Sequence, residues 1–488
     1  MQLYSSPSFA DTNKVIKLQK ILPEVDSIYK EYAEKNHFPG YAYGIIVDGG
    51  LIHSGSGGFI DLEKKIPATS QSMFRIASMT KSFTAMAILK LRDENKLRLD
   101  DPVHLYIPEI QNLKLTEDSP IITIRDLLIH LAGFSTDDPW ADRKLEETEN
   151  ELLEFLKKGV FLSNVPGTVF EYSNLGYALL GYIIKKVTNT PFGKFITESL
   201  CEPLGMQDVS WDFGEISPSK LVHGYRWEDN HWIEESLLKN GIFGAMGGMI
   251  TSVESFSRYV ALHLSAWPPR NDCESGPIKR SSLREMHLPW NFRELLVEKC
   301  LNGQEHVLTK GYGYGLNWSK DGLGRVVVGH SGGLPGFGCN WSIMPEYGIA
   351  LILFANVTYA AAGKLNLEIL DKLTLAGELK PRQLPSSSIL KTRKNDLVKF
   401  LPDWNNAFNS GVFADNFFLD RSIDSLKNEA VELFKKAGTI ISISELVPEN
   451  QLRGSFIIKC EILSLYVKFA LTPENPPLIQ EYHIKPLV

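Results

Sequence analysis

The chain has 488 residues, of which 43% are hydrophobic and 22% are charged, and these proportions exclude a disordered, collagen-like or coiled-coil protein. This length has room for one large enzyme domain and a smaller one. The formal net charge is −7, from 51 basic and 58 acidic residues, which argues against a nucleic-acid-binding surface. No apolar run approaches the roughly 18 residues that a transmembrane helix needs.

The first hundred residues predict a helix, a hairpin and a second helix. Apolar residues recur at helical spacing over 12–36, which predicts one helix there. The apolar runs 41–47 and 51–58 flank a Gly-Gly turn, a pattern that is typical of a β-hairpin. An apolar helix is then expected to begin near Ser78.

The middle of the chain, about 95–300, is predicted to be mainly helical, with clear amphipathic stretches at 147–158 and 174–188. Strand patterns return at residue 311. The expected strands are 324–329, 339–344 and 349–355, and a helix is expected over 361–375. Early and late strands around a helical middle favour one antiparallel sheet flanked by helices, an α+β arrangement.

A polar, Pro- and Ser-rich segment at 379–391 predicts a linker between two domains, 1–378 and 392–488. The second is expected to be a small α+β domain. Its expected elements are a helix at 423–436 and strands at 439–446, 453–460, 464–471 and 478–485. It holds no cluster of catalytic residue types, so we expect it to shape the cleft, bind a partner or mediate homo-oligomer formation.

The cysteines and the first residues say little about the compartment. The five cysteines form no C-x-x-C pair and their number is odd, so neither a disulfide framework nor a finger-type zinc site is expected. Residues 1–10 lack the charged start and apolar stretch of an intact signal peptide. Two alternatives stay open: a periplasmic or secreted protein whose leader is absent from this sequence, or a cytoplasmic one.

Searches for phosphate-loop, dinucleotide-binding, zincin and G-x-S-x-G motifs find nothing, and what remains is S-x-x-K at Ser78–Lys81. The same pattern starts at four other serines. Ser27 and Ser236 are expected in helical stretches, and Ser217 and Ser388 are expected in loops. Ser78 alone stands at the start of an apolar helix.

At a helix start, residues i and i+3 share a face, so the Lys81 amine can reach the Ser78 hydroxyl. The positive end of the helix dipole favours an alkoxide and a neutral lysine. A desolvated lysine can then take the proton of the serine, which is otherwise a weak nucleophile. The alternative is an N-cap serine with a surface lysine.

A second motif is Tyr172-Ser173-Asn174, directly before an apolar helix. A tyrosine and an asparagine two residues apart can project into one cleft, where the phenol would serve as acid or base and the amide would bind substrate. The alternative reading is an asparagine that caps the helix.

A third motif is His330-Ser331-Gly332-Gly333, at the end of an expected strand; His53-Ser54-Gly55 has similar letters but lies in the first hairpin. Glycines on a strand let the substrate backbone approach, and a free N–H there can face an oxyanion. The alternative is a β-bulge followed by a turn.

In this order, the three motifs resemble those of the class C β-lactamase and DD-peptidase family of serine acyl hydrolases, with its related esterase and D-aminopeptidase branch. Flanking blocks extend the resemblance over about 20–375. The blocks are 74–85, 124–133, 172–184, 202–206, 244–252 and 329–337. The resemblance implies a β-lactamase/transpeptidase-like domain with an antiparallel sheet flanked by helices and an all-helical subdomain.

The resemblance also implies a role for each residue. Ser78 would be the nucleophile that becomes acylated, with Lys81 as its base. Tyr172 would pass the proton to the leaving group and activate the deacylating water. Asn174 would bind the substrate amide, and the backbone N–H groups of Ser78 and Gly333 would form the oxyanion hole.

His330 stands where the β-lactamases of this family have lysine, and Ser331 stands where they have threonine. A histidine is largely neutral above pH 6.5, so it would anchor a β-lactam carboxylate weakly. We therefore expect a serine hydrolase that acts on a peptide, a D-amino-acid amide or a small ester. The alternatives are a true β-lactamase or DD-carboxypeptidase and, from another class, a catalytically idle binding or scaffold protein. No metal or other cofactor is expected.

Overall fold

The computed structural model describes residues 4, 12–299, 305–382 and 385–487. The chain divides into two compact units, Met1–Arg382 and Gln383–Val488. Each has its own hydrophobic core. None of the described helices is both long and apolar enough to cross a lipid bilayer.

The first unit is built on a nine-stranded sheet in the order β3-β2-β1-β14-β13-β12-β11-β10-β9, with neighbours antiparallel throughout. Its strands are β1 (Gly40–Val47), β2 (Gly50–Asp61), β3 (Ile66–Pro67), β9 (Asn291–Lys299), β10 (Glu305–Tyr312), β11 (Asn317–Asp321), β12 (Val326–Leu334), β13 (Phe337–Met344) and β14 (Ile349–Ala355). β1 pairs with β14, with Tyr41 opposite Ala355. The prediction of one antiparallel sheet from early and late strands is confirmed.

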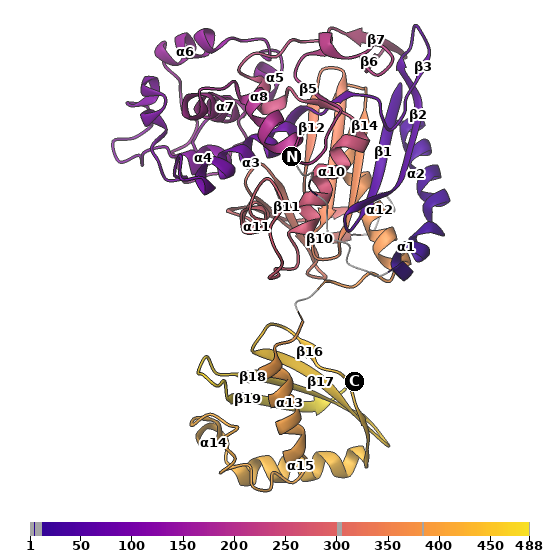
Figure 1. Ribbon diagram of the computed structural model, residues 1–488, viewed down its shortest axis with the longest axis vertical. Coiled ribbons are helices and arrows are strands. Elements are labelled where there is room, and N and C mark those ends of the chain that lie inside the picture. Colours follow the sequence, from indigo (N-terminus) through magenta and orange to yellow (C-terminus); the bar gives the residue numbers. More distant parts are fainter. Residues whose placement is uncertain (1–3, 5–11, 300–304, 383–384, 488) are drawn as a thin grey trace. The chain divides into compact units, whose positions relative to one another are not determined.

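Helices cover both faces of this sheet (Figure 1). On one face lie α1 (Thr12–Gln19), α2 (Leu22–Lys35) and α12 (Ala362–Ala376). On the other lie α3 (Thr80–Asp93) and α10 (Val253–Ser265), whose Phe83 and Phe256 share a core with Trp341 of β13. The single helix expected over 12–36 is in fact two, because Pro23 lies in the first turn of α2, where its missing N–H is tolerated.

A largely helical region joins the early and late strands. Its helices are α4 (Ile124–Leu128), α5 (Asp138–Ala141), α6 (Glu149–Lys157), α7 (Asn174–Thr188), α8 (Phe192–Ile196) and α9 (Gly244–Gly247). The helices predicted at 147–158 and 174–188 are confirmed as α6 and α7. The region is not purely helical, because two small sheets also lie in it. Their strands are β4 (Phe74–Arg75), β5 (Val209–Ser210) and β8 (Ile250–Thr251) in one, and β6 (Gly224–Glu228) and β7 (His231–Glu235) in the other.

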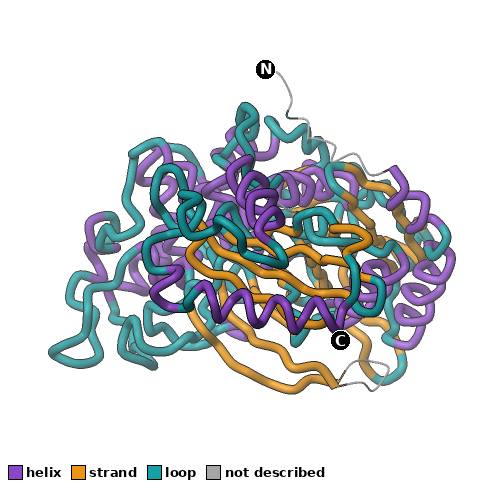
Figure 2. Tube along the Cα trace, turned by 90° about the horizontal axis from the view of Figure 1, so that it is seen from below, coloured by secondary structure: helices purple, strands orange, loops and turns teal. Residues whose placement is uncertain are grey.

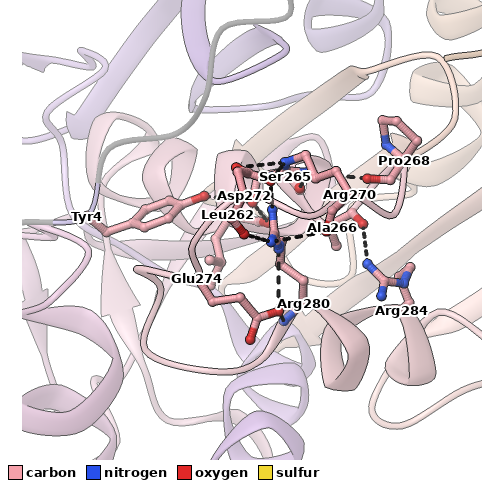
Figure 3. A network of polar contacts seen from close by, with 10 residues as sticks. All are labelled: Tyr4, Leu262, Ser265, Ala266, Pro268, Arg270, Asp272, Glu274, Arg280 and Arg284. Carbon is pink, nitrogen blue, oxygen red and sulfur yellow. Dashed lines mark hydrogen bonds and ion pairs between the residues drawn. The ribbon is translucent and has the colours of Figure 1, made fainter. Parts of the chain in front are cut away.

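The late strands of the sheet begin earlier in the chain than expected, because β9 and the start of β10 precede residue 311. The segment that leads to β9, through α11 (Arg280–Met286), is held by polar contacts around two arginines (Figure 3). Arg280 binds Asp272 at 2.6 Å and Glu274 at 3.4 Å, and Arg270 Nε lies 2.9 Å from the same Asp272. This network ties the loop before α11 to Arg280, the first residue of that helix.

The second unit is a small α+β fold. Its elements are α13 (Ser388–Phe400), α14 (Phe417–Asp420), α15 (Ile423–Ala437), β15 (Ile440–Ile443), β16 (Val447–Pro448), β17 (Arg453–Cys460), β18 (Ser464–Leu471) and β19 (Ile479–Pro486). Leu397 of α13 and Leu426 of α15 share a core with Phe456 of β17. Figure 2 shows helices in purple and strands in orange. The predicted helix at 423–436 and the four predicted strands are confirmed.

The segment 379–391, predicted as a linker, is partly helical. α13 begins at Ser388, and the Ser387 side chain caps it by accepting a hydrogen bond from the Leu390 N–H at 3.2 Å. A serine is a favoured N-cap residue, so the Ser-rich stretch starts a helix rather than separating two domains along its whole length.

Candidate active site

Ser78 lies in a 3₁₀ turn, Ala77–Met79, directly before α3. Ala77 has a φ of 50°, a left-handed conformation that costs a non-glycine residue on the order of 1–2 kcal/mol. Strand β12 packs directly on this turn: a Cβ at Gly332 would lie 2.2 Å from the Ile76 carbonyl oxygen. Glycine is therefore required at this position, and the nucleophile candidate is held against the strand.

Lys81 is fully buried one turn further along and donates three hydrogen bonds. Its Nζ lies 3.0 Å from Ser78 Oγ, 2.6 Å from Asn174 Oδ1 and 3.0 Å from the Met246 carbonyl oxygen. An ammonium group has three hydrogens, so these contacts describe the protonated form. Burial lowers the pKa of Lys81 to about 8, which brings the neutral, basic amine within reach near neutral pH.

Asn174 opens α7 but does not cap it. The carboxylate of Asp137 does so, accepting hydrogen bonds from the N–H groups of Asn174 at 2.7 Å and Leu175 at 2.9 Å. The Asn174 amide instead bridges two groups, because Oδ1 accepts from Lys81 and Nδ2 donates to Asp138 Oδ1 at 2.6 Å. With both ends engaged and no exposure, this side chain holds Lys81 and does not line the cleft.

The side chains of Tyr172 and Ser78 line one cleft. Lys81 Nζ lies 4.8 Å from the centre of the Tyr172 ring, and the ring of His130 lies 4.4 Å away from it. Burial raises the pKa of Tyr172 well above its usual value of 10, so the phenol is protonated at neutral pH. His130 Nδ1 also accepts from the Ser173 N–H at 3.1 Å, which steadies the backbone beside Tyr172.

His330 lies on an unbroken part of β12, and no bulge interrupts its pairing with β13. His330 Nε2 lies 2.9 Å from the Tyr312 hydroxyl. Burial and the nearby Lys81 lower the pKa of His330 to about 3, so the imidazole is neutral. Beside it, the Ser331 hydroxyl accepts a hydrogen bond from Asn340 Nδ2 at 3.0 Å.

One cleft of about 430 Å³ brings most of these residues together. Of the predicted site residues, the cleft is lined by Ser78, Tyr172, His330, Ser331, Gly332 and Gly333. Lys81 lies directly behind Ser78. Six further residues line the cleft without belonging to the three motifs, namely Asp138, Asp142, Arg293, Asn317, Tyr359 and Ala360. No motif in the sequence singles them out, although Arg293 belongs to the segment 265–310, which the sequence suggests lines or flanks the cleft.

The other S-x-x-K serines lie outside this cleft. Ser27 lies in α2, as expected, and Ser217 lies in a loop. Two expectations were wrong: Ser236 lies in a loop after β7, and Ser388 is the first residue of α13. The similar His53 lies in β2, where its Nε2 contacts Asp26 Oδ1 at 2.6 Å.

The part of the chain that the structure describes holds no group of three or more His, Cys, Asp or Glu side chains placed to bind a metal ion.

Two solved structures share the fold. The octameric penicillin-binding protein homologue from Pyrococcus abyssi has a TM-score of 0.60 and 22% identity, and the match covers 96% of this chain and 90% of that one. A D-stereospecific amidohydrolase from Streptomyces sp. has a TM-score of 0.55 and 22% identity, over 70% of this chain and 97% of that one.

Sequence relatives share the first unit. Protein flp of Staphylococcus aureus (strain COL) is 27% identical over 344 residues, 70% of this chain and 64% of that protein. Beta-lactamase-like protein 2 of Dictyostelium discoideum is 29% identical over 279 residues, 54% of this chain and 50% of that protein. The matches thus span less than two thirds of the length of these relatives.

The Beta-lactamase family profile matches residues 25–375, which is most of the first unit. This match confirms the predicted family and, with the structures, the β-lactamase/transpeptidase-like fold. The members of the family are mostly serine hydrolases. The chain belongs to the Beta-lactamase family.

Proposed function

We propose that this protein is a serine acyl hydrolase that forms a covalent acyl-enzyme at Ser78 with a peptide, a D-amino-acid amide or a small ester. The observation that carries the proposal is the 3.0 Å contact between Ser78 Oγ and the buried Lys81 Nζ. This contact supports the proposal because the pKa of Lys81 is lowered, and a neutral amine at that distance can act as a base for the serine hydroxyl.

In acylation, the Ser78 oxygen attacks the substrate carbonyl carbon while neutral Lys81 takes the hydroxyl proton. The carbonyl oxygen becomes an anion, which the N–H groups of Ser78 and Gly333 stabilise. When the intermediate collapses, the bond to the leaving amine or alcohol breaks. Tyr172 donates its phenolic proton to that group and recovers a proton from Lys81, so the enzyme is left neutral and acylated.

In deacylation, the same groups work in reverse order on water. Tyr172 and Lys81 take a proton from a water molecule as its oxygen attacks the ester at Ser78, and the acid product leaves as the Ser78 hydroxyl re-forms. Asn174, which holds Lys81 at 2.6 Å, acts here as a positioning residue. Its predicted role in binding the substrate amide requires its Nδ2 to leave Asp138.

The neutral, buried His330 supports weak action on β-lactams, because it offers no fixed positive charge to their carboxylate. A second candidate function, β-lactam or DD-peptide hydrolysis, is favoured by one observation. Arg293 lines the same cleft and is a cation that could take over this role. The likeness to a D-stereospecific amidohydrolase supports amide substrates.

Labelling with a fluorophosphonate, followed by mass spectrometry, tests the proposal against an idle scaffold of the same fold. We expect one adduct, located at Ser78 and absent from Ser78→Ala. Wild-type protein that is folded and takes up no label would contradict the proposal. A panel of p-nitrophenyl esters, D-alanyl-D-alanine peptides, D-amino-acid amides and a chromogenic cephalosporin then ranks the substrate classes.

A further inference from the structure

Two carboxylates in the cleft have no part in the proposed proton transfers. Asp138 and Asp142 lie one helical turn apart, at α5 and its C-cap, and both line the cleft with Ser78. In the described part of the chain, no lysine, arginine or histidine forms an ion pair with either. Asp137, their neighbour, is occupied in capping α7.

Asp142 is the more unusual of the two, because it is only 2% exposed. One of its oxygens, Oδ2, accepts a hydrogen bond from the Tyr359 hydroxyl at 2.7 Å. The other oxygen has no hydrogen-bond partner among the described residues, although the side chain lines the cleft. Burial raises the pKa of Asp142 to about 6, with Asp138 and Asp137 adding to the rise, although the Tyr359 hydrogen bond and the nearby Lys81 oppose it. A buried carboxylate of this kind is stabilised by a bound cation.

The position of Asp142 along the cleft determines which group of a bound substrate can contact its carboxylate. A Cβ at Gly333 would lie 2.6 Å from the Tyr359 ring, so Tyr359 and Asp142 lie at the Gly333 end of β12. The opposite end is marked by Asn317, which pairs with Gly329 and accepts a hydrogen bond from Arg293 at 3.1 Å. The two ends are four residue steps apart along β12, from Gly329 to Gly333, which is about 13 Å.

Ser78 lies between the two ends, since Gly332 packs on the turn that carries it. The cleft is therefore negative on the side of the oxyanion hole and positive on the side of His330. In an α-amino acyl group, the nitrogen lies only about 2.5 Å from the carbonyl carbon. A substrate that presents its carbonyl to Ser78 can thus place an α-ammonium group at the Gly333 end.

We propose that Asp142, with Asp138 beside it, binds the α-ammonium group of the residue whose carbonyl Ser78 attacks. The substrates are then amides, peptides or esters of amino acids with a free α-amino group. The inference rests on the proposed function of Ser78 and adds the part of the substrate that is recognised. N-acylated substrates lose the positive charge and the hydrogens that the carboxylates would bind.

The test compares alanine p-nitroanilide with isobutyryl p-nitroanilide, which has a methyl group in place of the ammonium. Both enantiomers of the alanyl compound are used. We expect the kcat/KM of wild type to be about thirty-fold or more higher for one alanyl enantiomer than for the isobutyryl compound. Coupling energies of close charge pairs correspond to factors of this size or larger. Asp142→Asn keeps the shape of the side chain and should reduce this preference by about tenfold or more.

Two variants serve as controls. Tyr359→Phe removes the hydroxyl but keeps the carboxylate, so the preference should fall less than in Asp142→Asn. Asp118→Asn, at an exposed position outside the cleft, should keep the wild-type preference. If Asp142→Asn does not fold, wild type alone decides: isopropylammonium should slow fluorophosphonate labelling at concentrations where 2-propanol does not.

The outcomes separate this inference from the proposed function. Absence of labelling at Ser78 would overturn the proposed function and the inference with it. Labelling at Ser78, combined with equal turnover of charged and neutral substrates and no protection by isopropylammonium, would overturn the ammonium site alone. An unchanged preference in folded Asp142→Asn would overturn the assignment to this residue.

Discussion

The two units of the chain bury different kinds of side chain. Around Ser78, the first unit buries a lysine, an asparagine, two histidines and an aspartate, namely Lys81, Asn174, His130, His330 and Asp142. In the second unit, the buried polar side chains among residues 385–487 are Arg393, Ser455 and Thr472, and the core is otherwise apolar and aromatic.

The partners of these groups differ as well. Arg393 donates to the Pro477 carbonyl at 2.8 Å and contacts Asp396 at 3.2 Å, so its charge is used to hold its own fold together. In the first unit, Lys81 contacts the Ser78 hydroxyl, Asn174 holds Lys81, and His330 and Asp142 line the same cleft as Ser78. Burial of a polar group is costly, so a cluster of such groups around a cavity indicates chemistry, whereas isolated ones indicate structure.

The largest expected effect separates two serines with the same S-x-x-K pattern, one in each unit. Ser78→Ala should reduce turnover by at least about a thousandfold, because the acyl-enzyme cannot form. Ser388→Ala, at an exposed helix start, should leave turnover unchanged. Hydrolysis rates of the two purified variants on the best ester or amide check this. Loss of activity in Ser388→Ala alone would contradict the proposal and place the chemistry in the second unit.

The next effect concerns pH. The lowered pKa of Lys81, about 8, means that the neutral base accumulates as the pH rises through that value. From pH 7 to pH 9 the neutral fraction rises about tenfold, so kcat/KM for acylation should rise by the same factor and then level off. Pre-steady-state acylation rates measure this. A rate that falls over this range would show that Lys81 acts as a cation and not as a base.

A third change concerns the core of the second unit. Trp404 is fully buried there, and Trp404→Ala should lower the free energy of unfolding of this unit by about 3–5 kcal/mol. Phe408→Ala, at a mostly exposed position, should cost less than about 0.5 kcal/mol. Urea denaturation followed by circular dichroism compares the variants. The labelling rate at Ser78 should be the same in both.

Removal of the second unit should have a small effect on chemistry. The truncation should follow Arg382, since its guanidinium donates to the carbonyls of Pro345 at 2.6 Å and Leu264 at 2.9 Å. We expect Ser78 to be labelled within about threefold of the full-length rate, because the first unit has its own core. A soluble, folded truncation that no longer labels would make the second unit part of the active site.

The same pair of proteins tests homo-oligomer formation. If the second unit mediates it, light scattering should find an oligomer for the full chain and a monomer for the truncation. Oligomers of equal size would assign the contact to the first unit.

The smallest expected effect is that of metal removal. The described residues hold no metal-binding cluster, and the acyl transfer proposed for Ser78 and Lys81 needs no metal. Dialysis against EDTA should leave hydrolysis and labelling unchanged. A loss of activity that zinc restores would contradict this mechanism.

The three motifs could be singled out from the sequence because each is a short segment, and the structure brings most of their residues to one cleft. Lys81 reaches Ser78 within one helical turn, and Gly332 is required by the close approach of the Ile76 carbonyl oxygen. Asp142 was not predictable, because its partner Tyr359 lies 217 residues away along the chain. Arg293 could not be singled out from the sequence, because both faces of β9 are largely exposed and its apolar and polar residues do not alternate clearly.

The fold also has elements that could be predicted from the sequence and elements that could not. Strands with strong apolar runs, such as β14, were predicted at their observed places. α13 was missed because its apolar positions, Leu390 and Leu397, are diluted by charged residues and preceded by prolines and serines. The Ser387 cap and the packing of Leu390 and Leu397 against Trp404 and the strands of the second unit stabilise this helix.

The pairing of β1 with β14 has a consequence for synthesis of the protein. The central sheet cannot close until residue 355 has left the ribosome, because Tyr41 pairs with Ala355. At about 5–20 residues per second, Gly333 follows Ser78 by roughly 13–50 seconds. During that interval the nascent chain carries Ser78 without Gly333, its proposed partner in the oxyanion hole, and exposes the edge of β1. If Ser78 and Gly333 act together as proposed, the nascent chain becomes reactive only when the last strands add to the first.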